Sequence, residues 1–239
     1  MKKRLCLSCV IIALMITSKV TPQGFVKEIE GDDLGVLYGN QCIARLESGE
    51  EIQGKFAGAV MINGGITKIS IKLENGEKAK FKPEEVVSFL IKASGFAKLA
   101  MMAESGSSIQ ELTHSDFGEI VNRDYIIFET ARTAKKTDTY RLLQLLNPGF
   151  DSKIKVFATE TGKTGGTSIG GIKLTGGMDK AYLFVKGDEK AVMVKKSSYR
   201  KNFEELYSDC PEMLSVFEGD RIKWNDVAGH VFVYDQVCK

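Results

Sequence analysis

A short glycine-containing pattern occurs twice in this chain and restricts its fold more than any other feature. Leu46–Glu50 has the sequence Leu-Glu-Ser-Gly-Glu, and Leu73–Glu77, 27 residues later, has Leu-Glu-Asn-Gly-Glu. A three-residue hairpin loop needs a left-handed residue at its third position, which glycine adopts at little cost. Gly49 and Gly76 stand at that position, so both segments are predicted to be hairpins with the same loop.

The loop length also determines which residues face each other across a hairpin. A two-residue turn at Asn75–Gly76 would place Leu73 opposite Lys78 and mix apolar with charged side chains on one face. A three-residue loop keeps the apolar side chains together. It predicts these pairs: Leu73 with Glu77, Ile71 with Ala79, Ile69 with Phe81, Ala44 with Ile52, and Cys42 with Gly54.

Residues 36–92 are therefore expected to form a small β-barrel-like unit. After the second hairpin, Pro83–Glu85 makes a short turn and Val86–Ile91 an apolar strand. This strand order resembles that of an SH3- or Sm-like small barrel, a topology that hosts many unrelated functions. Cys42 is expected to face the barrel interior as a structural thiol, because no base stands near it in the sequence.

Residues 125–196 are predicted to form a second antiparallel β unit, joined to the first by a connection over residues 93–124. In the connection, Phe96–Met102 fits a strand or a short helix, and Ser115–Val121 fits another short helix. Alternating apolar and polar residues from Lys153 to Ala158 predict a strand with one solvent-facing side. The candidate strands of the second unit are Tyr125–Thr130, Tyr140–Leu146, Lys153–Thr159, Ile172–Leu174, Ala181–Lys186 and Lys190–Lys195.

The chain ends in a predicted helical segment, residues 197–239. Helices are expected at Tyr199–Leu206, from Pro211 to about Phe217 with Asp209 as the N-cap, and from Asn225 onward. The predicted fold class is therefore mainly β with α: a small barrel-like unit, a second antiparallel unit and C-terminal helices.

The spacing of apolar residues in the last helix predicts a disulfide. Val227, Val231, Tyr234 and Cys238 fall on one stripe of that helix, which brings Cys238 towards the core. Cys210 lies near the start of the preceding helix, and these two ends meet in an antiparallel helix pair. A bond between Cys210 and Cys238 is therefore expected.

Residues 1–18 have the pattern of a secretory signal peptide. Lys2, Lys3 and Arg4 precede an apolar run that is too short to span a membrane, and Ser18 provides the small residue at the cleavage site. An uncleaved anchor is the alternative. Cleavage changes the formal net charge from +2 to −1, because three basic residues leave. The mature chain is thus expected in the periplasm or secreted, with no integral membrane span and no nucleic-acid partner.

Three cysteines remain after cleavage, and this odd number predicts one disulfide and one free thiol in an oxidising compartment.

One stretch matches a catalytic motif by sequence. Gly166–Gly170 reads Gly-Thr-Ser-Ile-Gly, the nucleophile-elbow pattern of serine hydrolases, with Ser168 as the nucleophile. Its flanks are glycine-rich and do not resemble a buried strand followed by a helix. The alternatives are a ligand-binding loop and an unstructured hairpin tip. The residues of the candidate ligand loop are Gly165, Gly166, Ser168, Gly170 and Gly171.

No cofactor or metal site is expected. Gly162-Lys163-Thr164 resembles the end of a phosphate-binding loop, but Phe157 stands where that pattern requires glycine. His114 and His230 lie far apart, and neither has a second ligand at zinc spacing.

The second half of the chain resembles a group of exported proteins from Gram-negative bacteria to which no function is assigned. The similarity extends over about residues 125–238 and implies export and a structural cysteine near the end of the chain, but no catalytic residue. The segments that carry it are Leu142–Gly149, Tyr199–Phe203, Asp209–Pro211 and Tyr234–Cys238.

Together these features predict an exported, non-enzymatic protein that binds a protein or small-molecule ligand outside the cytoplasm or belongs to the cell envelope. The alternative is an exported serine hydrolase that uses Ser168.

Overall fold

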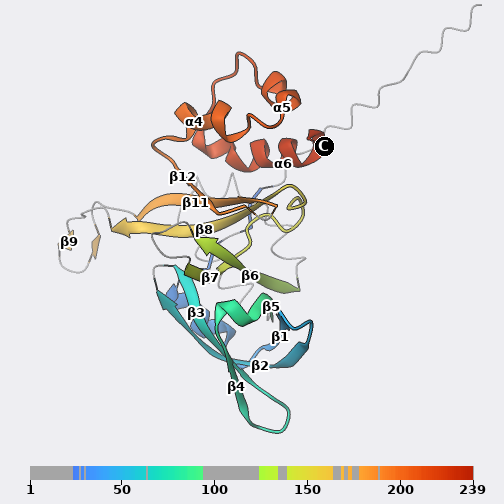
Figure 1. Ribbon diagram of the computed structural model, residues 1–239. Helices are drawn as coiled ribbons and strands as arrows, with labels where there is room; N and C mark the ends of the chain where they lie inside the picture. Colours follow the sequence, from blue (N-terminus) through green and yellow to red (C-terminus); the bar gives the residue numbers. More distant parts are fainter. Residues whose placement is uncertain are drawn as a thin grey trace, which may run out of the picture.

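The computed structural model describes residues 24–26, 28–29, 31–62, 64–93, 124–133, 139–163, 168–169, 172–173, 178–187 and 189–238. These residues form a closed six-stranded β-barrel, a second antiparallel sheet and a group of C-terminal helices (Figure 1). The predicted fold class is confirmed. The predicted leader 1–18 and the two candidate elements within 93–124 lie outside the described residues. Within the described residues, no helix is long and apolar enough to cross a membrane.

The barrel follows the strand order β2-β1-β5-β6-β7-β3 and closes where β3 pairs with β2. The short strand β4 shares one edge of β3 with β7: Ile66 pairs with Leu142 of β7, and Ile69 with Phe81 of β4. The elements of this part are η1 (Gly31–Leu37), β1 (Gln41–Leu46), β2 (Glu51–Ile62), β3 (Gly65–Lys72), β4 (Lys78–Phe81), η2 (Pro83–Glu85), β5 (Val86–Lys92), β6 (Tyr125–Thr133) and β7 (Thr139–Gln144).

Both predicted hairpins have the predicted register. The structure pairs Ile71 with Ala79 in one hairpin and Ala44 with Ile52 in the other. Gly49 and Gly76 adopt φ angles of 85° and 87°, the left-handed conformation that the three-residue loop requires. The hairpins are thus determined locally, by the loop and by the apolar face of each strand.

The predicted boundary of the second unit at residue 125 is corrected by the structure. β6 and β7 belong to the barrel, because β5 offers its second edge to β6 and pairs Phe89 with Phe128. β4, with four residues, is too short to complete the ring. These two strands therefore supply side chains such as Ile126 and Leu142 to the barrel core.

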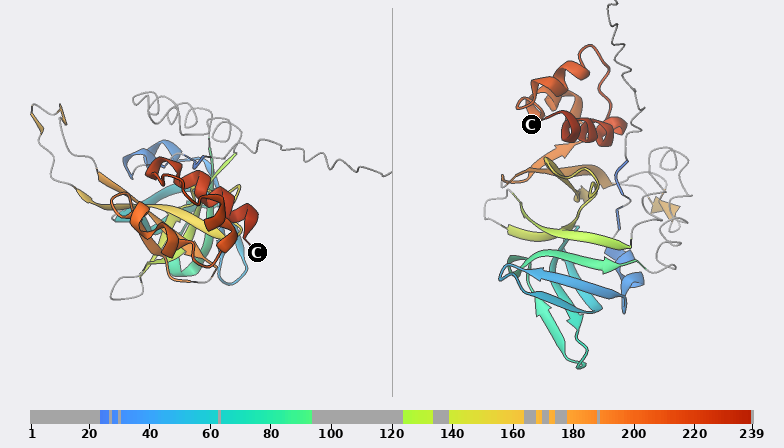
Figure 2. Two further views of the ribbon diagram at one scale, coloured as in Figure 1. Left: turned by 90° about the horizontal axis from the view of Figure 1, so that it is seen from above. Right: turned by 90° about the vertical axis from the view of Figure 1, so that its right-hand side faces the viewer.

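The second sheet contains three strands in the order β12-β11-β8. They are β8 (Ile154–Lys163), β11 (Met178–Lys186) and β12 (Val192–Lys195). Figure 2 shows this sheet as a middle layer, with the barrel on one side and the helices on the other. A separate pair, β9 (Ser168–Ile169) and β10 (Ile172–Lys173), lies between β8 and β11 in the sequence.

The predicted solvent-facing side of β8 is found only at its start, where the Lys155 side chain is 41% exposed, and is wrong at Phe157. Phe157 is only 1% exposed and packs with Leu143, Leu145 and Leu183, so this side of the sheet rests on the outer surface of β7. At the margin of the contact, Lys155 Nζ lies 2.6 Å from Glu129 Oε2 of β6. A strand between two layers buries both faces, which alternation along one strand cannot reveal.

The C-terminal helices cover the other face of the second sheet. They are α4 (Tyr199–Leu206), α5 (Pro211–Val216) and α6 (Val227–Val237), with η3 (Trp224–Asp226) leading into α6. α4 has the predicted bounds. The predicted N-cap Asp209 is wrong: Cys210 occupies that position and makes no side-chain capping bond. The Asp209 carboxylate instead accepts hydrogen bonds from Lys186 and Tyr234.

A segment before the first strand joins the layers. Val26 N donates to Leu146 O at 2.8 Å, and Ile29 N donates to the Gln144 side chain at 2.7 Å. Phe25 packs edge-on against Tyr182 of the second sheet, whereas Ile29 belongs to the barrel core. Residues 24–26 and 28–29 therefore stabilise both parts at once.

Candidate functional site

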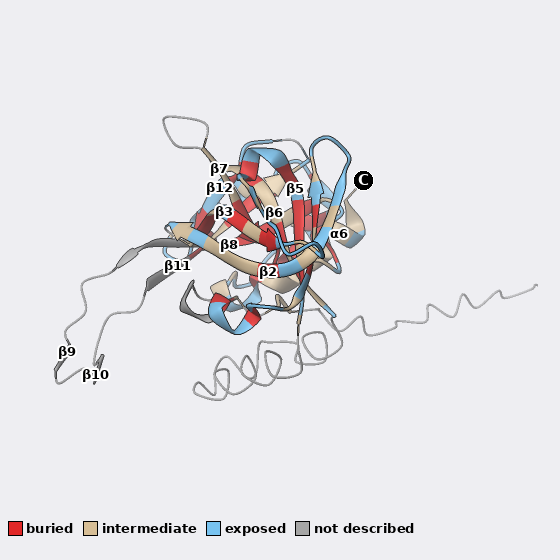
Figure 3. Cartoon of the chain, turned by 90° about the horizontal axis from the view of Figure 1, so that it is seen from below, coloured by how far each residue is buried: buried red, intermediate tan, exposed pale blue. Residues whose placement is uncertain are grey.

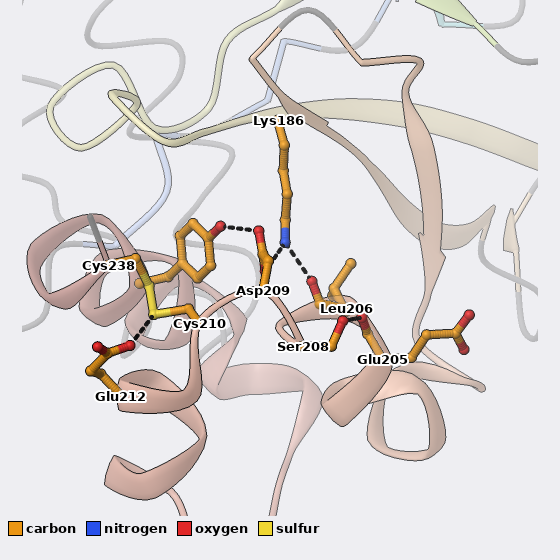
Figure 4. A network of polar contacts seen from close by, with 9 residues as sticks. Lys186, Glu205, Leu206, Ser208, Asp209, Cys210, Glu212 and Cys238 are labelled. Atoms are coloured by element: carbon orange, nitrogen blue, oxygen red, sulfur yellow. Dashed lines mark hydrogen bonds and ion pairs between the residues drawn. A yellow bond between two sulfur atoms is a disulfide. The ribbon is translucent and has the colours of Figure 1, made fainter.

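The predicted disulfide is present. Cys210 and Cys238 are bonded, with their Cα atoms 5.6 Å apart, and the bond joins the start of α5 to the end of α6 (Figure 4). The remaining cysteine among the described residues, Cys42, is buried in the barrel core. Burial raises the pKa of the Cys42 thiol to about 12, so it stays protonated and unreactive. Its predicted inward position is confirmed.

A polar cluster lies beside the disulfide and links the second sheet to the helices. Lys186 Nζ, from the end of β11, lies 2.6 Å from Asp209 Oδ1 and 2.7 Å from Leu206 O. Tyr234 of α6 donates a hydrogen bond to the other carboxylate oxygen of Asp209 at 2.6 Å. Figure 4 shows Lys186 reaching from the sheet to the turn between α4 and α5.

The charges in this cluster stabilise one another. Burial by itself would raise the pKa of Asp209, but the hydrogen bonds from Lys186 and Tyr234 and the charge of Lys186 hold it below its ordinary value. Burial, with the bond to Asp209, raises the pKa of Tyr234. Lys186 Nζ also lies 4.7 Å from the centre of the Tyr234 ring, a cation–π distance. The cluster is thus an ion pair that holds the helices on the sheet, without a free acid or base.

His230 is enclosed in the same layer. Its Nδ1 lies 2.7 Å from the hydroxyl of Tyr199, which in turn lies 3.3 Å from that of Tyr207. Burial lowers the pKa of His230 to about 4, against the opposing effect of the charges of Asp226 and Asp220. The ring is therefore neutral at pH 7 and is held among aromatic side chains, which does not suit a general base for Ser168.

The structure describes only part of the candidate ligand loop. Ser168 lies in β9 and pairs with Lys173 of β10 in a two-stranded hairpin. A nucleophile elbow requires a strand, a sharp turn and a helix, and the residues around Ser168 that are described have a different conformation. Gly165, Gly166, Gly170 and Gly171 lie outside the described residues.

One exposed surface was missed by sequence reasoning: the outer face of β2, β3 and β4. Cross-strand pairing aligns Lys55 with Lys72, and Lys72 with Lys78, in a single row. Figure 3 shows the molecule from the barrel end, with exposed residues on the hairpins in pale blue. The term lysine face is used here for Lys55, Lys68, Lys72, Lys78, Lys80 and Lys82, all of them exposed.

No carboxylate of the described residues forms an ion pair with any of the six lysines of the lysine face. Two nearby acidic side chains have other partners: Glu51 is bonded to Gln53 and Arg45, and Glu77 to Asn75. The Glu85 carboxylate accepts a hydrogen bond from the backbone of Lys82. Part of the signal was present in the sequence, because the predicted hairpin register places Lys72 opposite Lys78. The alignment of Lys55 with Lys72 comes from the pairing of β2 with β3.

No protein-family model, curated protein or solved structure matches this chain. Among the described residues there is also no group of three or more side chains arranged to hold a metal ion. The function proposed below is therefore argued from the geometry of the chain itself.

Proposed function

We propose that this protein is exported and acts without catalysis, as a binding or envelope-associated protein of the periplasm or cell surface. The leader pattern of residues 1–18 supports export. The Cys210–Cys238 disulfide supports an oxidising compartment, because such bonds persist there and are rare in the cytoplasm. The resemblance of the second half to exported bacterial proteins agrees with this compartment.

The observation that carries the proposal is the lysine face. Like charges directly opposite each other destabilise a sheet by about 0.2 to 1 kcal/mol per pair. Lysines on an edge strand prevent aggregation, which accounts for Lys78 and Lys80 of β4. It does not account for Lys55 and Lys72, whose strands are paired on both edges within the barrel. A surface that weakens the fold and has no structural role is typical of a binding site.

Intact mass of the protein recovered from the cell envelope tests the compartment. We expect a chain beginning near Lys19 which, alkylated after denaturation, has one blocked thiol without reductant and three with it. A full-length chain with all five cysteines free would refute export.

Labelling with a fluorophosphonate probe tests the absence of hydrolase activity. We expect no labelling at high probe concentration. Labelling of the native chain that disappears in Ser168→Ala would replace this proposal with a serine hydrolase. His230→Gln serves as the control: if the native chain is labelled, this variant should be labelled equally. The buried His230 is bonded to Tyr199 and is not expected to affect a reaction at Ser168.

A further inference from the structure

The outer face of β2, β3 and β4 forms a grid of side chains, with register shifts in β2 between Phe56 and Gly58 and between Val60 and Met61. The first row is Lys55, Lys72 and Lys78, and the next row along the strands includes Ser70 and Lys80. Neighbouring strands lie about 4.8 Å apart, and residues on the same face repeat about every 7 Å along a strand. Charges at these spacings can contact several anionic groups of a surface at once.

The middle row of the grid has room for an anion. Gly58 faces Ser70 across the β2–β3 pair, and a side chain at Gly58 would meet nothing within 4 Å. The Ser70 hydroxyl has no hydrogen-bond partner among the described residues. Lys72 follows on the same face of β3, and Lys80 lies directly opposite on β4. A phosphate group placed here would accept a hydrogen bond from Ser70 between two ammonium groups.

The grid continues into exposed aliphatic residues. Val60 is directly opposite Lys68, and Ile62 follows two residues later at the end of β2. Their side chains are 50% and 49% exposed. The same face of the barrel therefore presents cations at one end and branched apolar side chains at the other.

We propose that this face binds an anionic membrane surface, with the lysines at the lipid phosphates and Val60 and Ile62 in the interfacial layer; the inference rests on the proposed export. Lysines near an anionic leaflet each strengthen binding about fivefold. The described positions of β2, β3 and β4 on this face carry no aromatic side chain, which a site for nucleic-acid bases uses for stacking.

Co-sedimentation with vesicles tests the proposal on the processed chain. Phosphatidylcholine vesicles with phosphatidylglycerol are compared with vesicles of phosphatidylcholine alone. We expect binding only to the anionic vesicles, weakening as salt is added. The triple variant Lys72→Gln/Lys78→Gln/Lys80→Gln is expected to lose roughly a hundredfold in partitioning.

A matched variant controls for net charge. Lys196→Gln/Lys201→Gln/Lys223→Gln removes the same charge from exposed positions outside the lysine face and is expected to retain wild-type partitioning. Val60→Ser/Ile62→Ser, which keeps every lysine, is expected to reduce the binding that remains at high salt. Equal losses in the two triple variants, or equal binding to neutral vesicles, would refute the proposal.

Two further measurements separate this inference from the proposed function. A single-stranded DNA that binds more tightly than the vesicles, and loses binding in the Lys72/Lys78/Lys80 variant, would assign the face to nucleic acid instead. The thiol count and N-terminus are determined on the same sample. If the chain is processed and disulfide-bonded but does not bind anionic vesicles, only the proposed membrane binding is refuted. If the chain is unprocessed and has free thiols, export is refuted.

Discussion

The two ends of the molecule use lysine in opposite ways. At the helical end, the Lys186 side chain is only 20% exposed. It forms an ion pair with Asp209, donates a hydrogen bond to Leu206 O and lies over the Tyr234 ring. At the barrel end, Lys55, Lys72 and Lys78 stand in a row with no carboxylate opposite them. A lysine that is enclosed and paired stabilises the fold, and one left exposed among like charges is available for a partner.

The two ends are nevertheless one folded body. The cluster around Phe157 includes residues of the barrel strands and of the second sheet, and the backbone of Ala191 donates to Arg132 O across the same junction. The barrel is thus supported through β6 and β7, and the outer faces of β2, β3 and β4 carry the exposed lysines.

The largest expected effect comes from breaking this junction. Phe157→Ala should lower the free energy of unfolding by about 3 to 5 kcal/mol, because it leaves a cavity in a packed layer. Trp224 fluorescence reports on the helical end and alkylation of Cys42 on the barrel end. Both probes should detect the loss. A change at Trp224 alone would mean that the ends unfold independently. Val192→Ala, at an exposed position, is the control.

Removing the disulfide should weaken the helical end by a similar amount. Replacing Cys210 and Cys238 by alanine opens a loop with a sequence separation of 28 residues, for which loop entropy predicts a loss of about 3 to 4 kcal/mol. Urea unfolding of the variant should match that of the reduced native chain. Binding to anionic vesicles should persist under conditions where the variant is folded, since the lysine face lies in the other layer.

The helical end should also respond to acid through His230. Unfolded histidine binds a proton below pH 6.5, whereas the folded side chain does so only below about pH 4, because burial disfavours its charge. The free energy of unfolding should therefore fall as the pH drops from 6.5 to 4, by up to about 3 kcal/mol.

One histidine variant isolates this effect. His230→Gln should flatten the dependence of stability on pH in this window, whereas the native chain should keep it. An unchanged slope in His230→Gln would contradict the assignment.

The smallest effect compares the two kinds of lysine directly. Lys186→Gln should lower the free energy of unfolding by about 1 to 2 kcal/mol, a value reduced by the partial exposure of Asp209. Lys72→Gln should raise it by about 0.2 to 1 kcal/mol, because it relieves repulsion from Lys55 and Lys78. The opposite signs should be clearest at low salt, in urea titrations; equal signs would remove the distinction between the two ends.

Much of this architecture could be predicted from local patterns. The two hairpin registers follow from Gly49 and Gly76, because the loop conformation depends on the residues inside it. α4 and the Cys210–Cys238 pair follow from helix spacing within a short stretch of chain. The predicted register of the β3–β4 hairpin also places Lys72 opposite Lys78, so part of the lysine face could have been found from the sequence.

Other features depended on partners far away in the sequence. The role of Asp209 was mispredicted as a helix cap because its actual partner, Lys186, lies on a different layer. β6 and β7 join the barrel because β5 has an open edge and β4 is too short to fill it. Phe157 is buried because the outer surface of β7 covers it.

The sequence by itself therefore determined the hairpins, the helices, the disulfide and the pattern of a leader, since each depends on residues close together along the chain. Only the tertiary structure decided how many strands close the barrel, that Phe157 of β8 is buried between two layers, and which lysines remain without a partner. These outcomes depend on which strand edges pair with each other and which apolar surfaces pack together. Segments far apart in the sequence make these contacts, so they are fixed only when the whole chain packs.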